Sequence, residues 1–374
     1  MIAALKMETI GNIWDYVWPF LVILAVIVFA HEMGHYIVAR INKVRVEVFS
    51  IGFGPEIFGI NDRHGTRWKF SLLPLGGYVK FFGDANVASG PDKQIDNISP
   101  DEKLYSFHHK RVGQRAAIVL GGPAANFLFA IILFAILFGT VGQRYTPAEV
   151  NEVKQGSPAE IAGLLPGDKI LAVNGNAIDR FEDLQYLVTQ SPNINMTFQI
   201  DRLGLKKDID IKPELIEHKD QFGTIHRIGQ IGIIKSGVDF KTHNAGGAIW
   251  AAIEETAFMT WATLKAIGQM IGGSRSTEEL GGPIRIAEMS GQVAQQGFVT
   301  VLFFMAVLSI NLGLINLFPV PMLDGGHLIF YIFEAIRGKP LKPKFQEYGL
   351  RFGFLLVIIL MIWVTTKDVI RLGW

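Results

Sequence analysis

The chain is 374 residues long, with 49% hydrophobic residues, 18% charged residues and a formal net charge of +1. This length is sufficient for two or three domains, and the low charged fraction together with a positive mean hydropathy favours a membrane protein. A net charge near zero gives no indication of a nucleic-acid partner. The absence of cysteine excludes disulfide bonds, thiolate metal ligands and a cysteine nucleophile. Any metal site must therefore use His, Asp and Glu side chains.

Four apolar stretches are candidates for helices that cross a bilayer, which takes about 20 residues. They lie at about 17–39, 116–141, 298–318 and 350–365. The first could instead be a cleaved signal peptide, but Lys6 together with Glu8 and Asp15 makes a poor basic leader. We therefore expect an α-helical polytopic membrane protein with about four transmembrane helices.

Lysine and arginine residues are concentrated in two of the connections between these stretches. The first connection contains Arg40, Lys43, Arg45, Lys110, Arg111 and Arg115, and the last contains Arg337, Lys339, Lys342, Lys344 and Arg351. Because cytoplasmic loops carry an excess of such residues, we expect both connections in the cytoplasm. The long connection at about 144–297 and both termini are then expected to be extracytoplasmic.

Two short segments after the first apolar stretch alternate apolar and polar residues, as half-buried β-strands do. The alternating apolar residues are Val44, Val46 and Val48 in one segment and Trp68, Phe70 and Leu72 in the other. A turn-rich run at 61–65 separates them. This pattern predicts a membrane-associated β-hairpin with an accessible backbone edge.

The long connection contains two further pieces. Residues at about 146–236 have short strand patterns, Gly-Asp and Asn-Gly turns and a globular composition, whereas 246–271 is apolar with a few charges, typical of a helix that lies along a membrane surface. We therefore divide the chain into a first half of the membrane core (1–142), an extracytoplasmic α+β domain (143–238), a surface helix with a linker (239–297) and a second half of the core (298–374).

The first apolar stretch contains the sequence His31-Glu32-Met33-Gly34-His35. On a helix, positions i and i+4 lie on one face, so both imidazoles can bind one zinc ion while the adjacent glutamate takes a proton from a bound water. Three ionisable residues within five positions of a membrane span are costly and usually functional. His31 is expected about 12 Å from the cytoplasmic end of the span. The alternative is a polar cluster that packs helices together.

A catalytic zinc ion needs a third protein ligand, for which Asp324 is the best candidate. It follows Pro319 and Pro321, which interrupt the third apolar stretch, and irregular backbone at membrane depth is tolerated where it lines a watery cavity. The alternative role of Asp324 is to cap the following helix. Four other histidines are weaker candidates. His64 lies in the predicted hairpin turn, His108 and His109 lie in the basic cytoplasmic segment before the second apolar stretch, and His327 follows the aspartate.

The histidine motif in a first transmembrane helix, followed far downstream by Asn316-x-x-Pro-x-Pro-x-Leu-Asp324-Gly, resembles the site-2 protease family of intramembrane zinc metalloproteases, and within it the RseP (regulator of sigma-E) type. The resemblance includes Gly-Pro-Ala-Ala-Asn126 in the second span. It implies zinc ligation by His31, His35 and Asp324, with Glu32 as catalytic acid/base. Asn316 and Asn126 would position substrate or stabilise the oxyanion; for each, an interhelical hydrogen bond is the alternative.

The segment at 156–175 resembles a PDZ domain of the kind attached to bacterial proteases, and the loop has room for one such domain. The resemblance implies that this domain filters substrates; the alternative is a spacer. The resemblance to the site-2 protease family implies one zinc ion per chain and residence in a bacterial inner membrane. It also implies single-span membrane-protein substrates already trimmed by another protease, such as anti-sigma factors or remnant signal peptides. A PDZ-bearing membrane adaptor with a non-catalytic metal site is the alternative function, and a zinc-dependent transporter would want more ionisable residues inside the spans.

Overall fold

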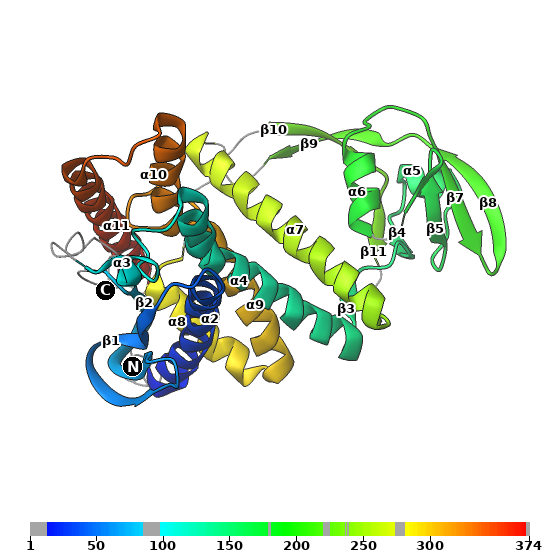
Figure 1. The fold of residues 1–374 in the computed structure, drawn as a ribbon. Helices are drawn as coiled ribbons and strands as arrows, with labels where there is room; N and C mark the ends of the chain where they lie inside the picture. The colour runs from blue at the N-terminus through cyan, green and yellow to red at the C-terminus, as the bar shows by residue number, and fades with distance from the viewer. Residues whose placement is uncertain are drawn as a thin grey trace. The chain divides into compact units, whose positions relative to one another are not determined.

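The computed structural model describes residues 13–84, 98–178, 181–219, 225–235, 237, 239–273 and 281–371 (Figure 1). The chain forms two compact units, one made of Met1–Leu137 with Gly247–Trp374 and the other of Phe138–Gly246. Both chain ends, and with them the expectation about their side of the membrane, lie outside the described residues.

Within the described part of the chain, four helices are long and apolar enough to cross a membrane. They are α2 (Ile13–Ile41), α4 (Val112–Thr140), α9 (Phe298–Asn316) and α11 (Pro343–Arg371). At about 1.5 Å per residue, even the shortest of them has nearly the length of the hydrocarbon core, which is about 30 Å thick. The expected four spans are thus confirmed, although α11 begins earlier than predicted.

The remaining helices of this unit are short or lie in the connections between the spans. They are α3 (Pro100–Lys103), α7 (Ala245–Ile271), α8 (Pro283–Gln295) and α10 (Asp324–Arg337). Helix α7 occupies the segment for which a surface helix is expected, and its exposed side carries Trp250, Phe258 and Trp261. That it lies along the membrane stays a prediction.

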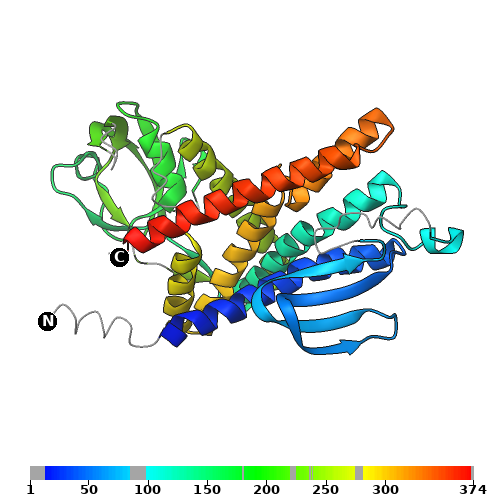
Figure 2. The same cartoon turned by 90° about the vertical axis from the view of Figure 1, so that its left-hand side faces the viewer.

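The predicted β-hairpin is confirmed, with β1 (Val46–Asn61) and β2 (Arg67–Phe81) longer than the sequence pattern indicated. Each strand bends, so that residues 48–51 of β1 face 77–80 of β2 on one side and 67–70 on the other. Residues 58–61 of β1 pair with the outer side of 67–70. The result is a sheet of four stretches, visible beside α2 (Figure 2), in which 77–81 forms one edge and 56–61 the other.

The turn of the hairpin is organised by Asp62. Its Oδ1 accepts hydrogen bonds from the backbone N–H groups of His64 (2.8 Å) and Thr66 (2.9 Å), while its Oδ2 accepts from the Trp68 indole (3.0 Å) and the Tyr36 hydroxyl (3.2 Å). Partial burial raises the pKa of Asp62, but these hydrogen bonds outweigh it and lower the pKa to about 2. The carboxylate therefore fixes the turn and joins it to α2.

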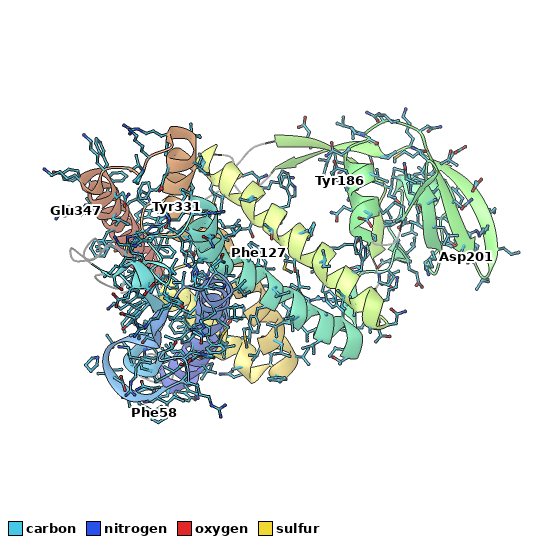
Figure 3. The ribbon with its side chains drawn as sticks, viewed as in Figure 1. Phe58, Phe127, Tyr186, Asp201, Tyr331 and Glu347 are labelled. Atoms are coloured by element: carbon cyan, nitrogen blue, oxygen red, sulfur yellow. The ribbon has the colours of Figure 1, made fainter. Side chains whose placement is uncertain are left out.

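The two sides of the hairpin sheet have different surroundings. Its inner part packs into a core shared with α2, α4 and α10, which contains Ala39, Val44, Val46, Phe49, Val79, Phe81, Phe107, Ile118, Val119 and Tyr331. Its outer part exposes large apolar side chains, among them Ile57, Phe58 (labelled in Figure 3) and Leu72. Large exposed apolar side chains gathered in one region are typical of a surface that contacts another apolar phase; that this phase is the membrane stays a prediction.

The second unit has an α+β architecture. Its central sheet has the order β6 (Asn176–Ala177), β5 (Lys169–Val173), β7 (Met196–Arg202) and β8 (Leu205–Ile211). Three strand pairs join β3 (Gln143–Tyr145) to β12 (Asp239–Lys241), β4 (Val150–Val153) to β11 (Ile233–Lys235), and β9 (Glu214–Lys219) to β10 (Ile225–Gln230). Helices α5 (Pro158–Ile161) and α6 (Phe181–Thr189) complete the unit. Its core is separate from that of the membrane unit.

Candidate metal centre

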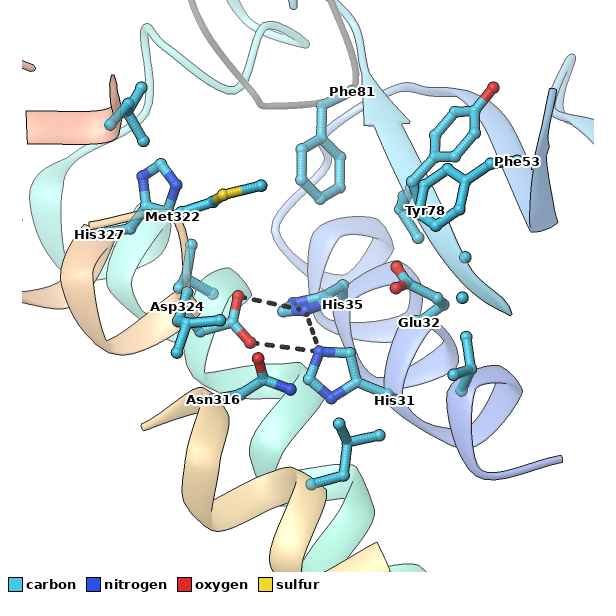
Figure 4. A pocket seen from close by; sticks show the side chains of 18 of the residues that line it. His31, Glu32, His35, Phe53, Tyr78, Phe81, Asn316, Met322, Asp324 and His327 are labelled. Carbon is cyan, nitrogen blue, oxygen red and sulfur yellow. Dashed lines mark hydrogen bonds and ion pairs between the residues drawn. The ribbon is translucent and has the colours of Figure 1, made fainter. Parts of the chain in front are cut away.

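His31 and His35 lie one turn apart on α2, and Asp324 is the first residue of α10 (Figure 4). The two histidine Nε2 atoms are 3.2 Å apart. Asp324 places Oδ2 3.2 Å from Nε2 of His31 and Oδ1 3.5 Å from Nε2 of His35. All three side chains are largely buried. The sequence-predicted ligands therefore converge on one point.

The spacing of these atoms fits a zinc ion. Zinc bonds to nitrogen and carboxylate oxygen are about 2.0–2.2 Å long and point to the corners of a tetrahedron, so two ligand atoms lie about 3.3–3.5 Å apart. Distances of 3.2, 3.2 and 3.5 Å match this geometry. In addition, Oδ2 of Asp324 is buried and accepts no hydrogen bond from any described residue. Three converging ligands and an unpartnered carboxylate oxygen are what a three-ligand zinc site requires.

Asp324 reaches this position through an irregular segment between α9 and α10. Helix α9 ends at Asn316, and the following prolines prevent its continuation. Met322 has a φ of 120°, a strained conformation for a residue with a side chain, and such strain clusters at functional sites. Side chains at Gly325 or Gly326 would collide with backbone carbonyls of the preceding segment. The tight path of the chain therefore aims the aspartate at α2.

The alternative role of Asp324 as a helix cap does not fit the structure. The N-cap of α10 is Leu323, which makes no side-chain capping hydrogen bond, and Asp324 lies within the first turn of the helix. Its carboxylate oxygens face the histidines instead.

Helix α10 is held against α4 by a buried ion pair. Arg115 Nη2 donates to Glu334 Oε1 at 2.5 Å, with both side chains about 12% exposed. The same guanidinium lies 4.9 Å from the centre of the Tyr331 ring, within the range of cation–π attraction. These contacts fix the helix that begins with Asp324.

The other ring nitrogens of the two histidines face α4. Nδ1 of His35 lies 2.9 Å from the backbone oxygen of Ile118, to which it donates, since a carbonyl oxygen only accepts. Nδ1 of His31 lies 3.2 Å from Nδ2 of Asn126, which is fully buried. Asn126 thus lies behind His31 and does not line the cavity in front of it.

Close approach of α4 to α2 depends on glycines. A methyl group at Gly34 would collide with the Gly121 backbone oxygen, and one at Gly121 would lie 2.7 Å from the Gly34 oxygen. At Gly122, a methyl group would collide with His35 Nε2. These glycines bring α4 into direct contact with the predicted ligands. The histidine motif alone does not predict this contact between the two helices.

A cavity of about 560 Å³ opens in front of the ligand atoms. Glu32, 9% exposed, extends its carboxylate into the cavity beside the histidines (Figure 4). Asn316 and His327 also line it, and Asn316 lies next to His31 and Asp324 (Figure 4). Gly77 of β2 runs directly over Glu32, since a methyl group there would lie 3.1 Å from Glu32 Cγ. Cavity, ligands and strand edge thus form one site.

The competing histidines lie elsewhere, apart from His327. His64 is in the exposed hairpin turn, His108 Nε2 lies 2.8 Å from Asp84 Oδ1, and His109 Nδ1 contacts the Ser106 hydroxyl. Among the described residues, His31, His35 and Asp324 are the group of three whose ligand atoms could hold a metal ion.

Comparisons with known proteins agree with this geometry. A family model described as peptidase family M50 matches residues 19–360. A protein of Rhizobium meliloti named as a zinc metalloprotease is 44% identical over 367 residues, covering 96% of this chain and 98% of the relative. A Rickettsia conorii protein, also named as a zinc metalloprotease, is 40% identical over 353 residues, 94% of this chain and 97% of its own. Metalloprotease MmpA of Caulobacter vibrioides is 34% identical over 379 residues, 94% of each chain.

Among solved structures, the PDZ domain of an SdrC-like protein from Listeria monocytogenes is similar to a part of the chain. It is 23% identical and covers 24% of this chain and 88% of its own, with a TM-score of 0.19. The family model and the metalloproteases above match nearly the whole chain, and four of its helices are long and apolar enough to cross a membrane. On these grounds the chain belongs to peptidase family M50 and is a multi-pass membrane zinc metalloprotease.

Proposed function

We propose that this protease hydrolyses peptide bonds of membrane-spanning segments within the bilayer, with His31, His35 and Asp324 holding one zinc ion and Glu32 acting as general acid/base. The observation that carries the proposal is that His31 and His35 lie inside α2, a helix long enough to span the membrane, and converge there with Asp324 of α10. A soluble substrate gives no reason to bury such a costly cluster at membrane depth.

The chemistry follows from the positions of the side chains. A zinc ion at this site would polarise the scissile carbonyl and acidify a bound water. Glu32 extends into the same cavity without being needed as a ligand, so it is free to accept a proton from the attacking water and return it to the leaving amine. Asn316, beside His31 and Asp324, has an amide suited to hold the substrate carbonyl or the oxyanion.

The edge of the hairpin sheet offers a place for an unwound substrate. Residues 77–79 of β2 pair on one side with β1, and no other strand of the described residues pairs with them on the other side. This stretch borders the cavity next to Glu32. A transmembrane helix must unwind before its carbonyls can react, and an extended segment can add to a free strand edge through backbone hydrogen bonds. We expect the scissile bond to lie along this edge.

The substrates proposed are single-span membrane proteins that another protease has already trimmed, such as anti-sigma factors or remnant signal peptides. The second unit would act as the filter, as a single PDZ domain. Supporting this role, a groove of about 410 Å³ in that unit is lined by Leu184 and Val188 of α6, by residues of β10, by Ile231 between β10 and β11, and by Ile233 of β11. The proposed location is a bacterial inner membrane, with this unit outside and the catalytic site near the cytoplasmic face.

The proposal is tested by reconstituting the full chain in vesicles with a tagged single-span substrate. Glu32→Gln keeps the shape of the side chain but removes the base, so cleavage should fall by about 10²–10⁴-fold while zinc and substrate remain bound. Asp324→Ala should instead lose zinc. Cleavage by Glu32→Gln at the wild-type rate would overturn the mechanism and leave a substrate-binding adaptor as the better account.

A further inference from the structure

The side chain of Asn126 on α4 has one amide end against a predicted zinc ligand, while the other end has no hydrogen-bond partner among the described residues. Its Nδ2 lies 3.2 Å from Nδ1 of His31, whereas its Oδ1 is buried without a hydrogen-bond partner among the described residues. Both residues are buried. The orientation of this amide decides which hydrogen bond His31 can make.

The zinc site dictates the protonation of His31. Its Nε2 faces the other ligands, 3.2 Å from Asp324 Oδ2 and 3.2 Å from His35 Nε2, so Nε2 must offer its lone pair to the metal. A neutral imidazole carries one N–H, which is then on Nδ1. Nδ1 consequently needs an acceptor. An amide NH₂ group facing it would place two donors against each other, and no hydrogen bond could form.

His35 shows the same arrangement already satisfied. Its Nδ1 donates to the Ile118 backbone oxygen at 2.9 Å, and its Nε2 faces Asp324. Since that backbone oxygen can only accept, His35 is held in the form whose Nε2 is free for a metal. Both histidines therefore direct Nδ1 toward α4 and Nε2 toward the site.

We propose that Asn126 is a positioning residue that accepts the Nδ1–H of His31 through Oδ1, and so holds Nε2 ready for zinc. The inference rests on the proposed zinc ligation. A half-turn of the carboxamide exchanges Oδ1 and Nδ2, which are nearly equal in size, and moves no other atom. Because Oδ1 has no hydrogen-bond partner among the described residues, this half-turn breaks no hydrogen bond of Oδ1. The N–H on Nδ1 of His31 therefore decides which end of the amide faces the imidazole.

The rest of Asn126 is fixed from α9. Ser309 Oγ, fully buried, donates to the backbone oxygen of Asn126 at 2.9 Å. A methyl group on Gly313 would lie 3.2 Å from Asn126 Cβ. This packing holds the amide in reach of His31, as the outer hydrogen-bond partners of metal-bound histidines generally are held.

The test is the zinc affinity of the solubilised full chain, measured by competition with a chelator. Asn126→Asp keeps an acceptor and removes the donor, whereas Asn126→Leu is similar in size and removes both. We expect Asn126→Leu to bind zinc about 10–100-fold more weakly and Asn126→Asp to bind at least as tightly as the wild type. Ser290→Ala is the control, since it removes the hydrogen bond from the buried Ser290 Oγ to the Ile286 backbone oxygen within α8, and Ser290 does not line the cavity; it should leave zinc affinity unchanged.

An equal loss in Asn126→Asp and Asn126→Leu would mean that the amide acts as a donor or a spacer, and would overturn the inference. Wild-type affinity in Asn126→Leu would overturn it as well. A measurement that needs no variant is ¹⁵N NMR of the zinc-loaded wild type, in which the proton of His31 should be on Nδ1; a proton on Nε2 would contradict the proposal. A wild-type chain that holds no zinc would instead count against the proposed metal site itself.

Discussion

The position of Gly122 on α4 leaves no room for a side chain beside the zinc ligands. A methyl group there would collide with His35 Nε2 and lie 2.8 Å from His31 Cε1. It would also lie 2.6 Å from His35 Cε1. Carbon atoms in contact lie about 3.5 Å apart or more, so Gly122→Ala must displace the rings or α4 by roughly 0.9 Å. Metal–ligand distances vary by only about 0.2 Å. Both histidines would therefore leave their ligating positions.

Gly122→Ala is expected to lower zinc affinity and to reduce cleavage about 100-fold, the typical cost of a displacement near 1 Å in a catalytic site. Helix propensity acts in the opposite direction, because alanine is favoured over glycine by about 1 kcal/mol. Gly113→Ala is the control, since a methyl group there meets nothing within 4 Å. Zinc titration and the vesicle cleavage assay give the readouts. Wild-type zinc binding by Gly122→Ala would refute the packing argument.

Three further outcomes are expected. Glu334→Gln should lower the free energy of unfolding by about 3 kcal/mol, because it leaves Arg115 buried without its partner charge; denaturation of the solubilised protein measures this, and undiminished stability would contradict it. Burial raises the pKa of Asp62, but hydrogen bonds lower it to about 2. The stability that this carboxylate gives the hairpin is therefore complete above the unfolded pKa of about 3.9 and is lost as pH falls toward 2. Hydrogen-exchange protection of the hairpin should follow this profile, and Asp62→Asn should remove it; the same profile in the variant would count against the role of the carboxylate. Because the chain has no cysteine, single cysteines at Asn176 and Lys342 can be labelled selectively, and they should react from opposite sides of the membrane; labelling from one side would overturn the proposed topology.

The spans could be predicted from the sequence because hydropathy is a local property. The fourth span shows the limit of this approach. Helix α11 begins at Pro343, whose fixed φ and missing N–H suit a first helical position. The polar residues that follow, among them Lys344 and Glu347, hide the first turns from a search for apolar residues. Helix formation and membrane burial are separate properties, and only the second was visible in the sequence.

The two histidines of the candidate site could be paired from their spacing alone, because i and i+4 share a helical face. Asp324 was found through the proline and glycine residues around it, which mark backbone that a span does not otherwise tolerate. The environment of Asn126 could not be predicted from the sequence in the same way. Whether it faces substrate or His31 depends on how α4 packs against α2, which involves residues far apart in the chain. The glycine pair in the second apolar stretch was the one available signal of that close approach.

If the peptide bond is cut inside the bilayer, the position of the cleaved bond in the substrate will show it. His31 lies about 15 Å from the end of α2 at Ile41, by helical rise. Mass spectrometry of the products formed from a single-span substrate in vesicles should therefore place the cut within the apolar segment, near the end predicted to face the cytoplasm. A cut confined to the soluble flank of the substrate would contradict the account.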